Sequence, residues 1–380
     1  MAKSERYDVA VVGGGAIGLA CAWRAAQRGL RTVVLDSGEP GAWQVAAGML
    51  APVSEAEFGE RELLELGLQS ARRYPAFCAE LSEASGRDPG YRATGTLIVA
   101  RDRDEAEALE RLIAFRRGLG LEVERLRPSE ARRREGALAP TVRLAVEVAG
   151  DHSIDPRKLV AALAEAFERA HGELRARTRA AGLASEGDRM TGVELADGTV
   201  LAAGAVVVAA GVHVARLGRL PDAARVPVRP VKGQVLRLRD PRGPGLVERT
   251  IRGEEAYLVP RGDGRYVVGA TMEERGWDTA ATAGGVYELL REAYRALPEI
   301  AELDLAETLC GMRPGTPDNG PLIGRGSIDG LLLATGHYRN GILLAPVTAA
   351  AIASLIAGEE PPVDLEPFDP ARFTAAEVTR

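Results

Sequence analysis

The most regular pattern near the N-terminus is an apolar run, a glycine-rich turn and a helix-forming stretch. Residues 8–12 are valine-rich, which is typical of a strand buried on both faces of a parallel sheet. Glycines dominate residues 13–18, and helix-forming residues follow over 19–28. A second apolar run over 32–35 ends at Asp36. These segments predict a complete β-α-β unit within about thirty residues.

The middle of the chain alternates between helical and strand-like patterns. Asp155 and Pro156 supply an N-cap and a first-turn proline for one predicted helix. Asp197-Gly198 separates two strand-like segments and predicts a hairpin. Pro75 is expected to kink or split the longest helix. The predicted helices cover residues 61–85, 105–117 and 156–171, and the predicted strands cover 96–100, 191–195, 199–202 and 205–210.

From residue 221 onward, prolines separate short strand-like segments, which is typical of antiparallel sheet. These strands are predicted over 234–239, 257–259 and 266–270, before a helix over 286–296, a buried strand over 331–335 and a helix over 345–357. The predicted fold class is α/β plus antiparallel β: a discontinuous, doubly wound nucleotide-binding domain with an inserted antiparallel-sheet substrate domain. We assign residues 1–85, 150–220 and 306–380 to the nucleotide-binding domain, and residues 86–149 and 221–305 to the substrate domain.

Composition excludes several classes of protein. The 380 residues carry a net charge of −6, so we expect no nucleic-acid partner and no binding to an anionic membrane. Three cysteines and four histidines lack ligand spacing, so we expect neither a disulfide framework nor a metal site. Glycines or Pro346 interrupt the two long apolar segments, 9–22 and 341–358. We therefore expect a cytoplasmic protein without a membrane segment.

The glycine spacing predicts a dinucleotide site. Gly13, Gly15 and Gly18 permit a tight turn and close approach to a pyrophosphate, while the following helix offers free N–H groups. Asp36 ends the second strand, where an acid binds ribose hydroxyls and disfavours a 2′-phosphate. This unit alone does not separate NAD from FAD. A second strand-turn-helix, with its helix starting near Gly341, favours a flavin because its N–H groups would stabilise the reduced ring.

Six segments in order along the chain resemble the glycine oxidase family of D-amino-acid oxidase-like flavoproteins, which acts in thiazole (thiamine) biosynthesis. They are residues 11–18 (VVGGGAIG), 47–50 (AGML), 257–261 (YLVPR), 268–272 (VGATM), 311–316 (GMRPGT) and 336–346 (GHYRNGILLAP). The last is the most specific. The segment between Asp36 and Met49 is two residues shorter than the family pattern.

The resemblance implies noncovalent FAD held by residues from five parts of the chain. The implied contacts are Gly13, Gly15, Ala16, Ile17, Gly18, Asp36, Ser37, Ala47, Gly48, Met49, Ala180, His337, Tyr338, Arg339, Asn340, Gly341, Ile342 and Leu343. Cys310 has two interpretations: a covalent flavin link, as in related sarcosine oxidases, or a small core residue, which the resemblance favours. His213 is a further candidate for lining the cofactor site or for a plain loop position.

The substrate residues implied by the resemblance are Arg313, Arg339, Tyr257 and Met272. An α-amino acid needs a clamp for its carboxylate, and guanidinium gives bidentate geometry. Both arginines lie among glycine, proline and apolar residues, where a solvated surface charge is not expected. The Tyr257 hydroxyl reaches the same carboxylate or the tyrosine packs within the sheet; the sequence leaves both interpretations open.

The expected activity is oxidative deamination of glycine, or of small N-alkyl or D-amino acids, by O₂. The products are an imine, which hydrolyses to glyoxylate, and H₂O₂; positioning replaces a side-chain base. Alternatives are a sarcosine or D-amino-acid oxidase, a flavin dehydrogenase with another acceptor, an NAD-dependent dehydrogenase and a non-enzymatic flavin-binding module. We expect a homo-oligomer, with hand-over of the product to thiazole synthesis as an option.

Overall fold

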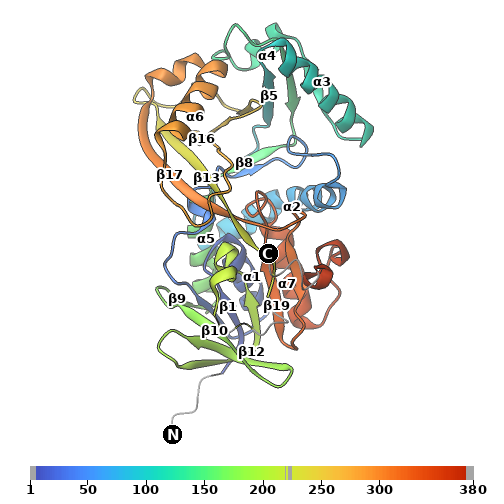
Figure 1. The fold of residues 1–380 in the computed structure, drawn as a ribbon, viewed down its shortest axis with the longest axis vertical. Coiled ribbons are helices and arrows are strands. Elements are labelled where there is room, and N and C mark those ends of the chain that lie inside the picture. Colours follow the sequence, from blue (N-terminus) through green and yellow to red (C-terminus); the bar gives the residue numbers. More distant parts are fainter. Residues whose placement is uncertain (1–5, 219, 221–224, 374–380) are drawn as a thin grey trace.

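A computed structural model describes residues 6–218, 220 and 225–373. The chain has a mixed α/β fold with several sheets. Figure 1 shows two regions stacked along the long axis, with α1 (Ala16–Gln27) in the lower region and α6 (Ala283–Ala296) in the upper. Across the described ranges no helix is both long and apolar enough to cross a bilayer.

The lower sheet is built from distant parts of the chain. Its parallel core joins β1 (Tyr7–Val12) to β2 (Thr32–Leu35) on one side and to β12 (Val200–Val208) on the other. β12 in turn pairs in parallel with β19 (Leu331–Thr335). Blue, green and red segments therefore lie side by side in Figure 1. The remaining strands are β9 (Glu173–Arg175), β10 (Ala180–Glu186), β11 (Arg189–Leu195) and β18 (Leu322–Arg325).

The two faces of this sheet are covered differently, which corrects the doubly wound prediction. Val9, Val11 and Val207 pack against a layer of helices. Ala10 and Val206, which point the other way, pack with residues of β10, β11 and the connecting segments, and this second cluster contains no residue of an α-helix. The helical layer consists of α1, α2 (Arg61–Ser85), α5 (Pro156–Arg169) and α7 (Ala345–Ala357).

The upper sheet has eight strands in the order β17-β13-β16-β15-β14-β5-β7-β6. It is antiparallel except that β14 pairs in parallel with β5. The strands are β5 (Thr96–Ala100), β6 (Glu124–Leu126), β7 (Leu144–Val148), β13 (Arg229–Arg239), β14 (Thr250–Arg252), β15 (Tyr257–Pro260), β16 (Arg265–Gly269) and β17 (Asp304–Gly315). β17 pairs with β13 along its length, so the predicted boundary at residue 306 falls inside a strand of this sheet.

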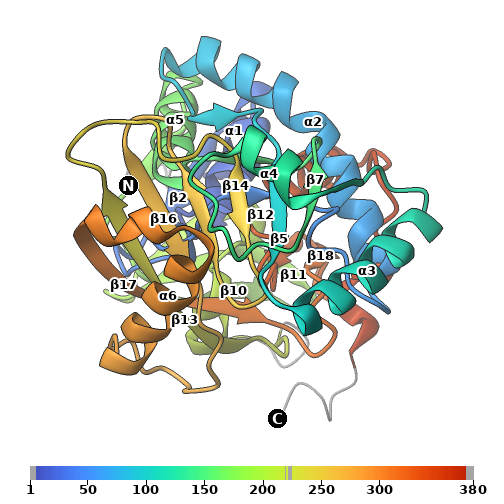
Figure 2. The ribbon, with the colours of Figure 1, turned by 90° about the horizontal axis from the view of Figure 1, so that it is seen from above.

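Helices cover the upper sheet on both faces. The cluster with Leu97 and Leu236 includes Leu289 of α6 and Ala131 of α4 (Pro128–Arg134). The opposite face of β5 packs against α3 (Arg103–Gly118) (Figure 2). A small sheet of β3 (Met49–Leu50), β8 (His152–Ile154) and β4 (Tyr91–Arg92) lies between the two large ones. Short 3₁₀ helices cover Ala42–Gln44, Gly211–Arg216, Pro298–Glu302, Glu366–Phe368 and Pro370–Arg372.

Local predictions mostly match, with three informative differences. Pro75 lies inside α2 without splitting it. The two segments predicted at 199–202 and 205–210 are one strand, β12, whose first half pairs antiparallel with β11 and whose second half joins the parallel sheet. The C-terminal helix covers the predicted 345–357, but its start at Ala345 lies four residues beyond Gly341, where its N–H groups were expected, and Gly341 lies in the preceding turn.

Candidate active site

A cavity of about 330 Å³ extends from the glycine-rich turn to the upper sheet. At one end it is lined by Gly13, Gly15 and Asp36, and at the other by Tyr257 and Arg313. Ligand cavities of this size bury small organic molecules. The two ends of the cavity differ in what forms them. Backbone at the start of a helix forms one end, and polar side chains on a sheet form the other.

The glycine-rich end is shaped for a phosphate. Gly13 has φ +114°, and a Cβ on it would lie 2.5 Å from the carbonyl oxygen of Ala209. Gly15 is the N-cap of α1 and offers no side-chain capping bond, and the first turn of α1 has no acidic residue. Free N–H groups at a helix start, with the positive end of the helix dipole, bind phosphate oxygens.

Asp36 lies directly beside this turn. A Cβ on Gly14 would lie 2.6 Å from Oδ2 of Asp36, so only glycine allows this approach. The Oδ1 atom accepts from the N–H of Gly38 at 3.0 Å, which fixes the carboxylate at the cavity wall. These features fit the adenosine and pyrophosphate half of a dinucleotide.

Most residues predicted from the sequence line this cavity. They are Gly13, Gly15, Ala16, Ile17, Asp36, Ser37, Ala47, Gly48, Met49, Ala180, His337, Tyr338, Arg339, Gly341 and Ile342 for the cofactor, with Tyr257 and Arg313 for the substrate. His213, left open by the sequence, also lines it and lies 3.2 Å from the Glu39 carboxylate.

Four predicted residues do not line the cavity. Gly18 packs against the carbonyl oxygen of Gly13, so its role is to let helix and turn approach. Asn340 and Leu343 line a separate small pocket under α2. Met272 is 63% exposed, and its sulfur accepts from the Tyr338 hydroxyl at 2.8 Å. Met272 therefore contacts the cavity through Tyr338 and not directly.

At the sheet end of the cavity, Arg313 forms few hydrogen bonds with the rest of the protein. Its Nη1 donates to the carbonyl oxygens of Thr271 at 3.1 Å and of Lys232 at 3.3 Å. A Cβ on Gly233 would lie 2.5 Å from the same nitrogen, so the neighbouring strand needs glycine there. Among the described residues no carboxylate forms an ion pair with Arg313, which leaves Nη2 and Nε for a ligand.

Arg339 lines the same cavity, but unlike Arg313 it is paired with a carboxylate. Its Nη2 lies 2.9 Å from Oε1 of Glu57 and 4.0 Å from Oε2 of Glu60. Burial lowers the pKa of Arg339, but the charges of Glu55 and Glu57 more than offset this, so its pKa lies above the ordinary value. The sequence predicted both arginines as substrate residues; in the structure Arg339 is paired with Glu57, whereas no described carboxylate is paired with Arg313.

Tyr257 places its hydroxyl at the sheet end of the cavity. A Cβ on Gly269, opposite in β16, would lie 2.5 Å from this oxygen. Burial raises the pKa of Tyr257, with the charge of Arg313 acting in the opposite sense. The hydroxyl is therefore protonated at neutral pH and available as a donor beside Arg313.

Glu55 is a further cavity residue that was not predicted from the sequence. It lies in the loop that precedes α2, lines the cavity, and forms an ion pair with Arg252 of β14 at 2.7 Å. No local motif marks this glutamate, since it follows Ser54 in a loop of mixed polarity. Its partner Arg252 is 197 positions away along the chain, so the pair exists only in the folded protein.

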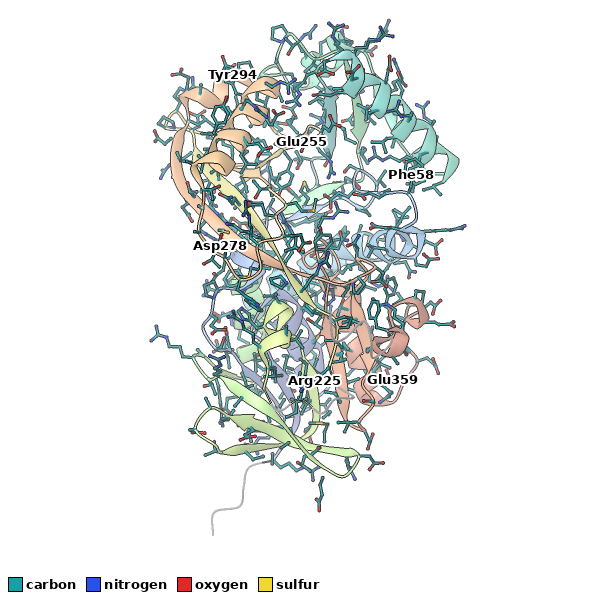
Figure 3. All side chains as sticks on the ribbon, viewed as in Figure 1. Phe58, Arg225, Glu255, Asp278, Tyr294 and Glu359 are labelled. Atoms are coloured by element: carbon teal, nitrogen blue, oxygen red, sulfur yellow. The ribbon has the colours of Figure 1, made fainter. Side chains whose placement is uncertain are left out.

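Cys310 lies on the other face of the upper sheet from the cavity. It pairs with Gln234, whereas the cavity is lined by the adjacent Gly233 and Gly311. On that outer side, Nζ of the fully buried Lys232 donates to Asp278 at 2.8 Å; Asp278 is labelled in Figure 3. Burial raises the pKa of the Cys310 thiol. This position argues against a covalent link to a flavin in the cavity.

His337 is a buried, neutral histidine. Its Nε2 lies 3.0 Å from the Thr348 hydroxyl, and burial lowers its pKa to about 3. Across the described residues no group of three or more His, Cys, Asp or Glu side chains is arranged to hold a metal ion.

Comparisons with known proteins agree with this geometry. The family described as "FAD dependent oxidoreductase" matches residues 8–355. Glycine oxidase of Geobacillus kaustophilus is 37% identical over 97% of this chain and 98% of its own. Its crystal structure superposes with a TM-score of 0.90 over 97% of this chain and 99% of that one.

Two further relatives differ in name. The hydrogen cyanide synthase subunit HcnC of Pseudomonas aeruginosa is 31% identical over 97% of each chain. The bifunctional protein ThiO/ThiG of Synechocystis is 35% identical over 96% of this chain, which spans 54% of that protein.

The family match covers nearly the whole chain, and the glycine-rich turn, uncapped helix and Asp36 fit FAD. The chain belongs to the FAD-dependent oxidoreductase family, is an FAD-dependent enzyme, and is similar to the glycine oxidases.

Proposed function

We propose that the protein oxidatively deaminates glycine and small N-alkyl or D-amino acids, using O₂ as the electron acceptor. The observation that carries this proposal is the un-neutralised guanidinium of Arg313, beside the Tyr257 hydroxyl at the sheet end of the cavity. An α-amino acid presents a carboxylate, and a guanidinium binds it through two parallel hydrogen bonds. The two carbonyl contacts of Nη1 hold the fork in one orientation.

The protein's own residues bind and orient the substrate. FAD, when bound, supplies the two-electron acceptor that converts the amine to an imine. Arg313 holds the carboxylate, and Tyr257 donates a hydrogen bond from a hydroxyl that stays protonated. His337 is bonded to Thr348 and its pKa is about 3, so it is a weak base; in this proposal orientation of the substrate carries the step without a side-chain base. The released imine hydrolyses to glyoxylate and ammonia.

The charges around the cavity favour substrates with a single carboxylate. Arg339 is paired with Glu57, and Arg252 is paired with Glu55. A second carboxylate on the substrate would therefore find Arg339 and Arg252 already paired and would approach the carboxylate of Glu55, which lines the cavity. This arrangement supports glycine, sarcosine and small D-amino acids over dicarboxylic amines.

Two relatives define the alternatives to be tested. The HcnC subunit is named for hydrogen cyanide synthesis, so cyanide is a candidate product from glycine. The ThiO/ThiG protein joins a relative of this chain to a second part, which supports hand-over of the oxidised product to thiazole synthesis.

We also propose that FAD is bound noncovalently and that the protein is a homo-oligomer. Gel filtration with light scattering measures the oligomeric state.

The test is anaerobic mixing of the yellow protein with glycine. We expect the flavin absorbance near 450 nm to bleach, as general flavin chemistry dictates, and then return with O₂ as H₂O₂ and glyoxylate form. Methylamine, which lacks a carboxylate, is the control and should not bleach it. Cyanide in place of glyoxylate would favour the HcnC-like activity. A flavin that none of glycine, sarcosine and D-alanine bleaches would overturn the proposal.

A further inference from the structure

Two buried arginines donate hydrogen bonds to backbone carbonyl groups in the wall of the cofactor cavity. Arg237 lies on β13 and Arg261 directly follows β15, and they are only 6% and 8% exposed. Arg237 has one weak ion pair, 4.0 Å to Glu307, and Arg261 has none with any residue that the structure describes. Buried cations are usually neutralised by a carboxylate, so this arginine pair requires another explanation.

The arginine pair, Arg237 and Arg261, holds the backbone of the cavity wall. Arg261 donates to the carbonyl oxygens of Ala47 at 2.8 Å and Ile154 at 3.0 Å. Arg237 donates to the carbonyl oxygen of Gln44 at 3.0 Å. Gln44 and Ala47 both line the cavity. The guanidinium groups therefore lie in a second layer, with one loop backbone between them and the cofactor space.

Both arginines keep their charge at neutral pH. Burial lowers the pKa of Arg261 to about 10, and burial also lowers the pKa of Arg237. Each Nε atom is buried and has no hydrogen-bond partner. Two positive charges thus lie in a poorly solvated region, where charge interactions are stronger than in water.

The loop that they hold faces the reactive end of the cavity. Val45 packs directly on Gly311, and Ala47 packs with Val235 and Val259 of the upper sheet. Tyr257 belongs to the same cluster. Residues 44–48 and Arg313 line the same cavity, so if Arg313 binds the substrate, as in the proposed function, residues 44–48 are candidates to contact the flavin ring.

We propose that Arg237 and Arg261 are positioning residues for FAD that also make its reduction easier. They hold residues 44–48 in the shape that receives the ring. Two-electron reduction with uptake of one proton leaves the flavin with one more negative charge, and nearby positive charge stabilises that form. The inference rests on the proposed function only for the place of the ring.

The test measures the midpoint potential of bound FAD against a reference dye, with dithionite as reductant and no amine present. Arg261→Met should favour oxidised over reduced FAD by at least tenfold, a fall of ~30 mV for a two-electron couple. Arg261→Lys keeps the charge but loses the fork, so it should weaken FAD binding while leaving the potential near that of the unmodified protein. The exposed Arg239 on the same strand gives the control, Arg239→Met.

An unchanged potential in an Arg261→Met protein that retains FAD would overturn the proposal. If Arg261→Met loses FAD, Arg237→Met breaks only one carbonyl contact and allows the same measurement. If both variants lose FAD, hydrogen exchange of the backbone amides of residues 44–48 is measured in the apoproteins. Protection in the variants equal to that in the unmodified apoprotein would refute the positioning role. None of these measurements uses an amine substrate. They therefore remain valid even if the protein does not oxidise glycine.

Discussion

The backbone N–H of Tyr338 donates to the carbonyl oxygen of Pro314 at 3.0 Å. This bond ties the turn after β19 to the end of β17, so that the segments carrying Arg339 and Arg313 reach one cavity. The two arginines nonetheless differ, because Glu57 neutralises Arg339 while Arg313 retains free donors.

Replacing Arg313 should impair glycine oxidation without loss of FAD. Arg313→Lys keeps the charge but loses the planar fork, so kcat/KM for glycine should fall about 10–100-fold, and Arg313→Ala should lose more. Stopped-flow flavin reduction at several glycine concentrations measures this, with Arg239→Lys as the control. An Arg313→Ala protein with normal rate and affinity would move the carboxylate clamp elsewhere.

Releasing Arg339 should change substrate preference. Glu57→Gln removes the carboxylate that lies 2.9 Å from Arg339, so a second substrate carboxylate gains a partner. The ratio of kcat/KM for iminodiacetate to that for glycine should rise about tenfold, the value of one charged hydrogen bond. Glu62→Gln on the exposed side of α2 is the control. No change in this ratio would show that Arg339 does not reach the substrate.

Asp36→Ala should weaken FAD binding. The substitution removes an acceptor for ribose hydroxyls and the bond to the Gly38 N–H, while the glycine turn remains. The loss should be ~1.5–3 kcal/mol, measured by titrating apoprotein with FAD and following flavin fluorescence. Equal affinity in the variant and the unmodified protein would contradict the ribose role.

Acid should destabilise the protein through His337. Its pKa is about 3 in the folded chain against an ordinary value of 6.5. Between these values the unfolded histidine binds a proton that the folded one does not, so stability falls as pH drops below 6.5, by at most ~1.4 kcal/mol per pH unit. His337→Gln should show a shallower fall of Tm between pH 7 and 5. Identical pH profiles would show that His337 titrates normally.

Denaturation should release all flavin from the protein. Cys310 lies on the sheet face that carries Gln234 and not on the cavity face. Acid precipitation followed by centrifugation should leave the yellow colour in the supernatant. Colour that stays with the polypeptide, and disappears in Cys310→Ser, would restore the covalent interpretation.

Short-range patterns predicted the elements well because the relevant forces act within a few residues. The segments 96–100, 331–335 and 345–357 match β5, β19 and α7 because they are apolar runs bounded by turn residues. The glycine turn and Asp36 were also found, since one β-α-β unit contains them all.

Long-range features were not predictable in the same way. The ion pair of Glu55 with Arg252 joins residues that are 197 positions apart along the chain. The neutralisation of Arg339 depends on a loop nearly three hundred residues earlier in the chain, as the separation of 282 positions from Glu57 shows. The cover on the second face of the lower sheet depends on how β10 and β11 fold back. No local spacing specifies these contacts.

The order of strands in the lower sheet also constrains how the protein is made. Val11 pairs with Val207, and Val207 pairs with Leu332. A ribosome that has released only the N-terminal β-α-β unit has exposed one valine-rich strand edge with no neighbour to cover it. The parallel core of the sheet that supports the glycine turn closes only after β19 has been translated. We therefore expect FAD to bind only a polypeptide that already includes β19, and a chain cut before β19 to aggregate in the cell.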